Sequence, residues 1–115
     1  MKAWATALES DKFIQGKHLL KYNYNRNTKY CCLGVLCEIS GNYKWEKEGS
    51  EGNESFYVVN EDGVIYSSGL PDHLISSLPD TLSQHALISA NDTLDMNFKQ
   101  IALMIRSHLP QIRKV

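Results

Sequence analysis

Three cysteines lie within seven residues of the chain, at positions 31, 32 and 37. A thiolate is a strong nucleophile when a helix N-terminus or a nearby imidazolium lowers the pKa of its thiol. Cys31 and Cys32 open an apolar segment, so either could be the nucleophile of a thiol-dependent enzyme with a histidine as base. The same run also suits three small, buried hydrophobic side chains. We favour burial and keep the thiol enzyme as the alternative.

The cysteines could instead bind a metal, with His18 as a fourth ligand. Structural zinc sites usually draw on two Cys pairs, or on one pair and two closely spaced histidines. The chain has only this one group of cysteines and its four histidines are scattered, so we expect no metal and no cofactor. An odd number of clustered cysteines also argues against a disulfide framework and for a reducing compartment.

A second candidate site is a segment in which aromatic and basic residues are interleaved. Rings can stack on a nucleotide base or a partner's side chain while basic groups hold an anion. The ordinary alternative is a half-exposed strand whose tyrosines suit a pleated surface. The candidate binding residues of this segment are Tyr22, Tyr24, Arg26, Lys29 and Tyr30.

Asn91 and Asp92 precede the last predicted helix and are further candidate binding residues. They could line a polar pocket at the helix N-terminus, which attracts anions. They could equally form a turn or a cap, because their side chains readily bond to the local backbone. Asp92 and Asp95 lie on a predicted solvated loop and do not indicate acid–base catalysis.

Apolar spacing predicts the helices that would position these groups. The predicted helices are Lys2–Ser10, Tyr30–Ser40, a short piece between Leu70 and Pro79, a piece from Asp80 or Thr81 to about Ala90, and Phe98–Leu109. The last has apolar residues at i, i+3, i+4, i+7 and i+11, with Asp95 or Asn97 as N-cap and Pro110 as its stop. A strand over Tyr30–Leu36 is an alternative, because periodicity cannot settle so apolar a run. Gly41 is the expected left-handed residue after that helix.

The remaining segments predict strands and turns. They are a turn with positive φ at Gln15–Gly16, a strand over Lys17–Tyr24, a turn at 25–27, an exposed loop over Asn42–Ser55, and strands Phe56–Asn60 and Val64–Ser67 joined by a hairpin turn. Short helices around a small antiparallel sheet make the expected fold α+β. In its core Phe98, Ile101, Ile105 and Leu109 should face Trp4, Leu8, Leu33 and Leu36.

The size and charge of the chain argue against several classes of protein. Its 115 residues fit a single domain, and no apolar run approaches the ~20 residues of a membrane span. The first nine residues are too short and too soon charged for a signal peptide. Residues 1–30 hold six Lys and Arg against two acidic residues, whereas 31–62 hold two against seven. A net charge of -1 disfavours a nucleic-acid polymer as partner.

Several short motifs together resemble a family of small phage and prophage proteins. They are Trp4 with Ala7-Leu8, Gln15-Gly16, Tyr30-Cys-Cys-Leu-Gly-Val-Leu-Cys37, Leu70-Pro71, and Asn91-Asp92 ahead of the terminal helix. The eight-residue block from Tyr30 is the distinctive part of the pattern. The resemblance implies a phage-encoded protein outside the virion, in the host cytoplasm, and carries no named activity. Asn97 stands where a serine is common, and it is an equally capable N-cap.

These observations favour a binding protein over an enzyme. The expected partner is a host bacterial protein, such as a defence protein that it inhibits, or a small nucleotide-like ligand that it sequesters. Self-association is left open. A thiol-dependent enzyme that uses Cys31 or Cys32 is the alternative.

Overall fold

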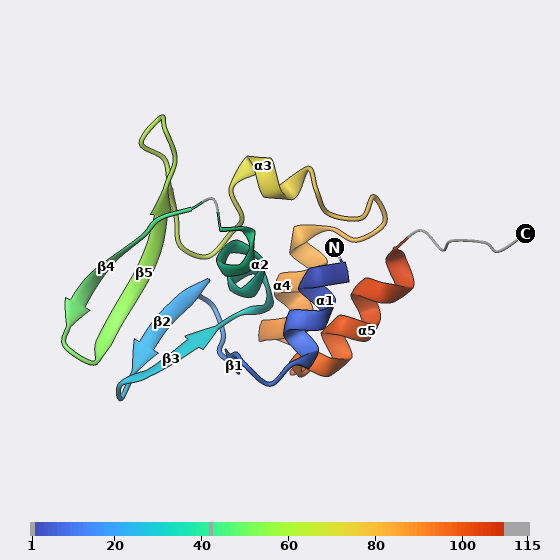
Figure 1. Ribbon diagram of the computed structural model, residues 1–115, viewed down its shortest axis with the longest axis horizontal. Helices are drawn as coiled ribbons and strands as arrows, with labels where there is room; N and C mark the ends of the chain where they lie inside the picture. The colour runs from blue at the N-terminus through green and yellow to red at the C-terminus, as the bar shows by residue number, and fades with distance from the viewer. Residues whose placement is uncertain (1, 42, 110–115) are drawn as a thin grey trace, which may run out of the picture.

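In a computed structural model, which describes residues 2–41 and 43–109, five helices pack beside a six-stranded mixed sheet (Figure 1). The helices are α1 Lys2–Glu9, α2 Cys32–Ser40, α3 Asp72–Ile75, α4 Gln84–Asp92 and α5 Phe98–His108. The strands are β1 Ile14–Gln15, β2 Lys21–Tyr24, β3 Asn27–Tyr30, β4 Trp45–Ser50, β5 Asn53–Val59 and β6 Ile65–Tyr66. The predicted α+β class is confirmed.

The sheet runs in the order β1-β3-β2-β5-β4, with β6 paired to β5. β1 is parallel to β3, and the other pairs are antiparallel. Figure 1 shows the β4–β5 hairpin projecting on one side while α1, α4 and α5 gather on the other, with α2 between them. The helix α2 therefore joins the sheet to the helical part.

Strand β4 corrects the prediction of an exposed loop over Asn42–Ser55. Trp45–Ser50 pairs along its whole length with β5, and Asn42 lies outside the described residues. The segment has no apolar alternation because nearly all of its side chains face solvent. Gly52, with a φ of 84°, lies in the turn between the two strands, and Gly49, with a φ of 121°, lies in β4 just before it.

The prediction of a strand over Lys17–Tyr24 is right only for Lys21–Tyr24. His18 has a φ of 74°, and this left-handed conformation interrupts the extended backbone that was predicted over Lys17–Tyr24. The predicted turn at 25–27 is confirmed, since Asn25 and Arg26 both have positive φ and connect β2 to β3. Tyr30 was predicted to begin the next helix, but it is the last residue of β3, and the helix begins at Cys32.

The prediction of a positive-φ turn at Gln15–Gly16 is wrong. Gln15 is in β1, and Gly16 is not among the residues with positive φ. A Cβ at Gly16 would lie 2.6 Å from the hydroxyl of Tyr22, so this glycine serves close packing. Gly34 does the same on α2, where a Cβ would come within 1.6 Å of the carbonyl oxygen of Leu20.

Helix ends follow the expected chemistry with one correction. Gly41 has a φ of 69°, and Asn97 forms a reciprocal capping box with Gln100, so both predicted caps are confirmed. Helix α4 begins later than predicted. Its N-cap is Ser83, whose hydroxyl accepts from the N–H of Ala86, rather than Asp80 or Thr81.

The predicted core is confirmed. Its buried members include Trp4, Leu8, Leu33, Leu36, Phe98, Ile101 and Ile105, while Leu109 is partly buried and packs against them. The apolar face of α5 lies against α1, which in turn contacts α2. One continuous core therefore holds both ends of the described chain together.

We expect Ile101→Ala to lower the free energy of unfolding by about 2–5 kcal/mol, because it removes three carbons from a fully buried site. Leu103 is on the same helix but 65% exposed, so Leu103→Ala should cost less than about 0.5 kcal/mol. Urea unfolding of both variants measures the difference. Equal effects would mean that the other face of α5 is buried.

Candidate functional site

The β2–β3 hairpin brings three of the predicted binding residues to one face of the sheet. Tyr22 pairs with Lys29, and Tyr24 lies two residues along the same strand, so their side chains share that face. Tyr24 is 55% exposed, and the ammonium of Lys29 lies 5.7 Å from the centre of its ring. Arg26 is exposed at the hairpin turn. We call Tyr22, Tyr24, Arg26 and Lys29 the hairpin surface.

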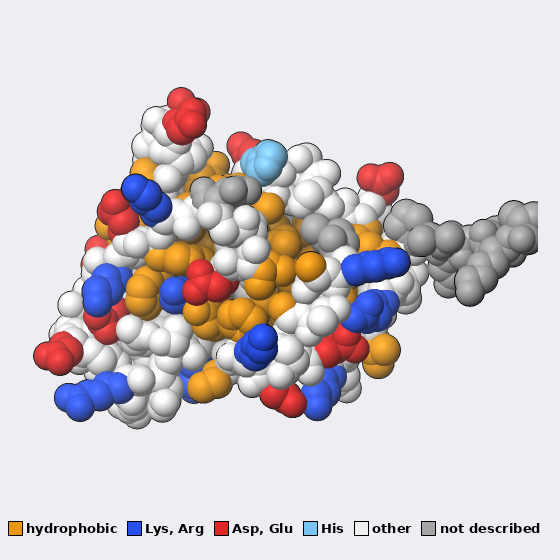
Figure 2. Space-filling model, viewed as in Figure 1, with side chains coloured by type: hydrophobic (Ala, Val, Ile, Leu, Met, Phe, Trp, Pro, Cys, Tyr) orange, Lys and Arg blue, Asp and Glu red, His pale blue; other side chains and the backbone are white. Residues whose placement is uncertain are grey.

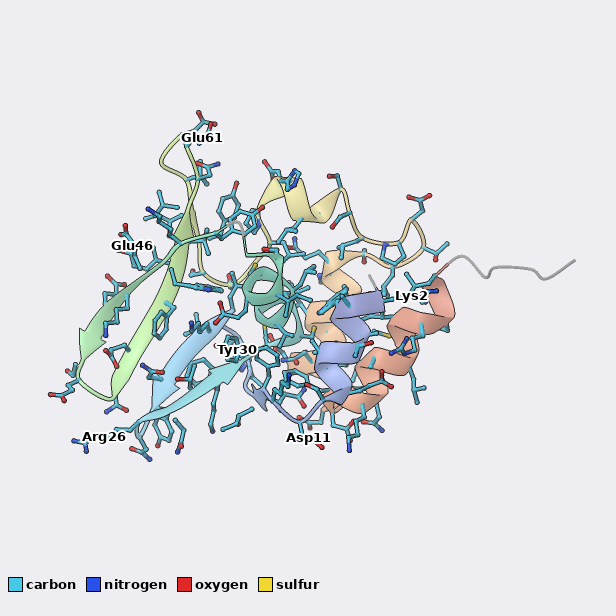
Figure 3. The ribbon with its side chains drawn as sticks, in the orientation of Figure 1. Lys2, Asp11, Arg26, Tyr30, Glu46 and Glu61 are labelled. Atoms are coloured by element: carbon cyan, nitrogen blue, oxygen red, sulfur yellow. The ribbon has the colours of Figure 1, made fainter. Side chains whose placement is uncertain are left out.

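Tyr30 does not join the hairpin surface. It pairs with Lys21, which places its side chain on the opposite face of the sheet, and it is buried. Its ring meets Phe13 edge-on at 5.1 Å, and its hydroxyl donates to Glu38 at 2.8 Å. Burial, together with the hydrogen bond and the charge of Glu38, raises the pKa of Tyr30. Figure 3 shows Tyr30 at the centre of the molecule, far from Arg26 at the hairpin tip.

Glu38 gathers three donors on this second face of the sheet. Its carboxylate accepts from the hydroxyl of Tyr30, from Nε1 of Trp45 at 2.8 Å and from Nζ of Lys21 at 3.1 Å. Burial alone would raise the pKa of Glu38, but the three hydrogen bonds and the charge of Lys21 outweigh it, and the pKa is lowered. Sequence reasoning missed this group. The available signal was a lone carboxylate at the end of an apolar helix, where it must find donors.

Asn91 is fully buried on α4, and its amide is completely hydrogen-bonded. Its oxygen accepts from Nε2 of Gln15 at 3.0 Å and from the N–H of Cys32 at 3.2 Å. Its nitrogen donates to the carbonyl oxygen of Gly16 and to Asp92, each at 2.8 Å. The backbone partners fix which end of the amide is oxygen. Asn91 therefore forms a structural junction between α4, β1 and the start of α2, and its groups have no capacity left for a ligand.

Asp92 extends this junction to the surface. Its carboxylate accepts from the backbone N–H of His18 at 3.1 Å and lies 3.6 Å from Nδ1 of the same residue. These contacts hold His18 in its left-handed conformation. The ring of His18 is mostly exposed, with 77% of its side-chain surface accessible. Asn91 and Asp92 thus belong to a different part of the molecule from the hairpin surface.

All three cysteines are buried, as favoured from the sequence. Cys31 is 5% exposed, Cys32 0% and Cys37 1%. Burial raises the pKa of Cys31 to about 11 and that of Cys37 to about 12, and it also raises the pKa of Cys32. The thiols are therefore protonated near neutral pH, which leaves a thiolate nucleophile without support in this geometry.

Two further features bear on possible functions. Within residues 2–41 and 43–109, no group of three or more His, Cys, Asp or Glu side chains could hold a metal ion. No helix in the same part of the chain has the length and apolar character to cross a bilayer.

Comparison with known proteins places the chain in a family. A model described as a domain of unknown function (DUF8296) matches residues 1–109. No curated protein and no solved structure matches the chain.

We expect the folded protein to react slowly with a small disulfide reagent at neutral pH, because its thiols are buried and protonated. Three thiols should react quickly once the protein is unfolded in denaturant, which serves as the internal control. Absorbance of the released thiol follows both reactions. Rapid labelling of one site in the folded protein would favour the thiol enzyme.

Proposed function

The chain belongs to the DUF8296 family, and we propose that it is a small phage-encoded protein that binds a host factor without covalent chemistry. The observation that carries the proposal is the hairpin surface, where an exposed aromatic ring and two cations lie together. Tyr24 supplies the ring, while Lys29 and Arg26 supply the charge. Aromatic and arginine side chains commonly provide most of the binding energy at protein interfaces.

The hairpin surface continues across a face of the sheet that does not pack against the core. Ile14 pairs with Lys29 in register and is 53% exposed, and Ile65 on β6 is 62% exposed on the same face. Neither belongs to the core cluster or to the residues packed against it. Two exposed isoleucines on other strands extend the candidate contact beyond the hairpin and beyond the size of a nucleotide, and this favours a protein partner.

Charge is distributed unevenly over this face. Arg26 and Lys29 lie near the β2–β3 turn, whereas Glu46 and Glu48 lie on β4 at the far edge of the sheet. The register pairs Glu48 with Ser55, and Ser55 with Tyr22, so both glutamates share the face of Tyr22. A partner with an acidic region opposite the hairpin would be attracted and oriented by this pattern. The proposed partner is an acidic host protein, such as a defence protein inhibited by the contact.

The setting in a bacterial cytoplasm rests on the resemblance of the motifs to small phage proteins. The two other candidates have less support. A small nucleotide-like ligand would use only Tyr24 and its neighbouring cations, and leaves the exposed Ile14 and Ile65 unexplained. A thiol enzyme would need Cys31 or Cys32 as a thiolate, against the raised pKa of both.

The test is affinity capture from bacterial lysate with mass spectrometry of proteins and small metabolites, followed by a mutant comparison. Arg26→Ala/Lys29→Ala should weaken binding of the captured partner by about tenfold or more, since two complementary charges are lost. Added salt should weaken the parent in the same way. The thermal midpoint should change little, because Arg26 is exposed and Lys29 is only half-buried, and charges near the surface contribute little to folding.

The matched control is Lys2→Ala/Lys12→Ala, which removes two exposed lysines from elsewhere on the molecule. It should bind like the parent. If the hairpin variant binds as tightly as the parent, or if both variants weaken equally, the hairpin surface is not the contact. Capture of a metabolite that depends on Tyr24 would replace the protein partner with a ligand.

A further inference from the structure

The ammonium of Lys21 sits among three aromatic rings on the second face of the sheet. Its Nζ lies 4.6 Å from the ring centre of Phe56, 5.1 Å from that of Trp45 and 5.4 Å from that of Tyr30. The carboxylate of Glu38 lies 3.1 Å away. We call Tyr30, Glu38, Trp45 and Phe56 the ammonium cage. Rings within about 6 Å of a cation attract it through their quadrupoles, and a charge-assisted hydrogen bond adds to this attraction.

The walls of the ammonium cage are fixed to one another without help from Lys21. The hydroxyl of Tyr30 and Nε1 of Trp45 both donate to Glu38, so the carboxylate ties β3 and β4 to α2. Trp45 meets Phe56 edge-on, with ring centres 6.4 Å apart. Removal of the lysine side chain would leave three rings and a carboxylate in place. Such a preorganised site loses little freedom when it takes another cation.

The ammonium cage is open to solvent on one side. The side chain of Glu38 is 33% exposed, whereas that of Lys21 is 13% exposed. Figure 2 shows this face of the molecule, where a band of hydrophobic side chains runs across the middle and encloses neighbouring acidic and basic groups. A cation on another molecule could therefore approach the carboxylate along this band.

We propose that the ammonium cage is a binding site for alkylammonium groups, such as the side chain of a lysine on a partner, and that Lys21 is its built-in occupant. Lys21 is tethered beside the site and competes at a high effective concentration. An external amine therefore binds weakly while Lys21 is in place and more tightly when it is displaced or removed. The site lies on the opposite face from the hairpin surface, so it is independent of the function proposed above.

The probe is n-butylammonium chloride, titrated into the Lys21→Ala protein, with n-butanol as its uncharged counterpart. Binding should change the fluorescence of Trp45 saturably and raise the thermal midpoint of the variant. The native protein should show an apparent affinity at least about tenfold weaker, because its own lysine competes. Butanol should neither change the fluorescence nor raise the thermal midpoint, since it lacks the charge that the rings and Glu38 recognise.

Two further variants identify the site. In the Lys21→Ala background, Glu38→Gln should weaken butylammonium binding by about tenfold or more, because the ionic partner is lost. Trp45→Phe should remove the fluorescence change, because the other tryptophan, Trp4, is fully buried and its fluorescence should not respond to the amine. An equal response to butanol, or an unchanged response after Glu38→Gln, would overturn the proposal.

A Lys21→Ala protein that fails to fold still gives a decisive result, because folding becomes the measurement. The proposal expects butylammonium to restore the native circular dichroism spectrum and butanol to leave it unfolded. If the variant folds but shows no saturable response, or if butylammonium cannot restore an unfolded variant, the ammonium cage is not a binding site.

Discussion

The side-chain amide of Asn91 is the interaction on which the arrangement of this protein depends. A buried primary amide must find two acceptors and two donors, or it loses several kcal/mol relative to water. Asn91 finds them on two other segments, at Gln15–Gly16 and at Cys32, and on its own helix at Asp92. Helix α2 has no side-chain cap of its own at Cys31, so its first N–H depends on the amide of Asn91. The hydrogen-bonding demand of one side chain thereby fixes where β1, α2 and α4 meet.

Helix α2 connects this junction to the second face of the sheet. Helix α2 starts at the Asn91 amide and approaches the backbone of Leu20 so closely that only Gly34 fits there. Near the other end of α2, Glu38 accepts hydrogen bonds from three donors, on Tyr30, Trp45 and Lys21. The same β2–β3 hairpin carries Tyr24 and Lys29 on its other side. A buried contact in the helical part thus positions the helix that supplies Glu38 to the ammonium cage.

Local structure, such as helix faces and caps, could be predicted from the sequence, whereas long-range polar contacts could not. The spacing of apolar residues on α5 and the capping box at Asn97 predicted that helix and its buried face, because both signals lie within a few residues. Strand β4 was not predicted because all of its residues after Trp45 are exposed, whichever face they lie on, and leave no apolar alternation. Asn91 was identified as a candidate, but its role was not evident, because three of its four partners lie 59 to 76 residues away. The ammonium cage is likewise assembled from four elements that only the fold brings together.

The most direct test of this account is a double-mutant cycle between Asn91 and Gln15, measured by urea unfolding. Asn91→Ala should lower the free energy of unfolding by at least about 3 kcal/mol, because it leaves the buried backbone groups of Cys32 and Gly16 without this partner. Gln15→Ala should cost less. The loss of unfolding free energy in the double variant should be smaller than the sum of the two single losses by at least about 0.5 kcal/mol, since both changes break the same hydrogen bond. A loss below about 1 kcal/mol for Asn91→Ala, with additive effects, would contradict the central role of the Asn91 amide.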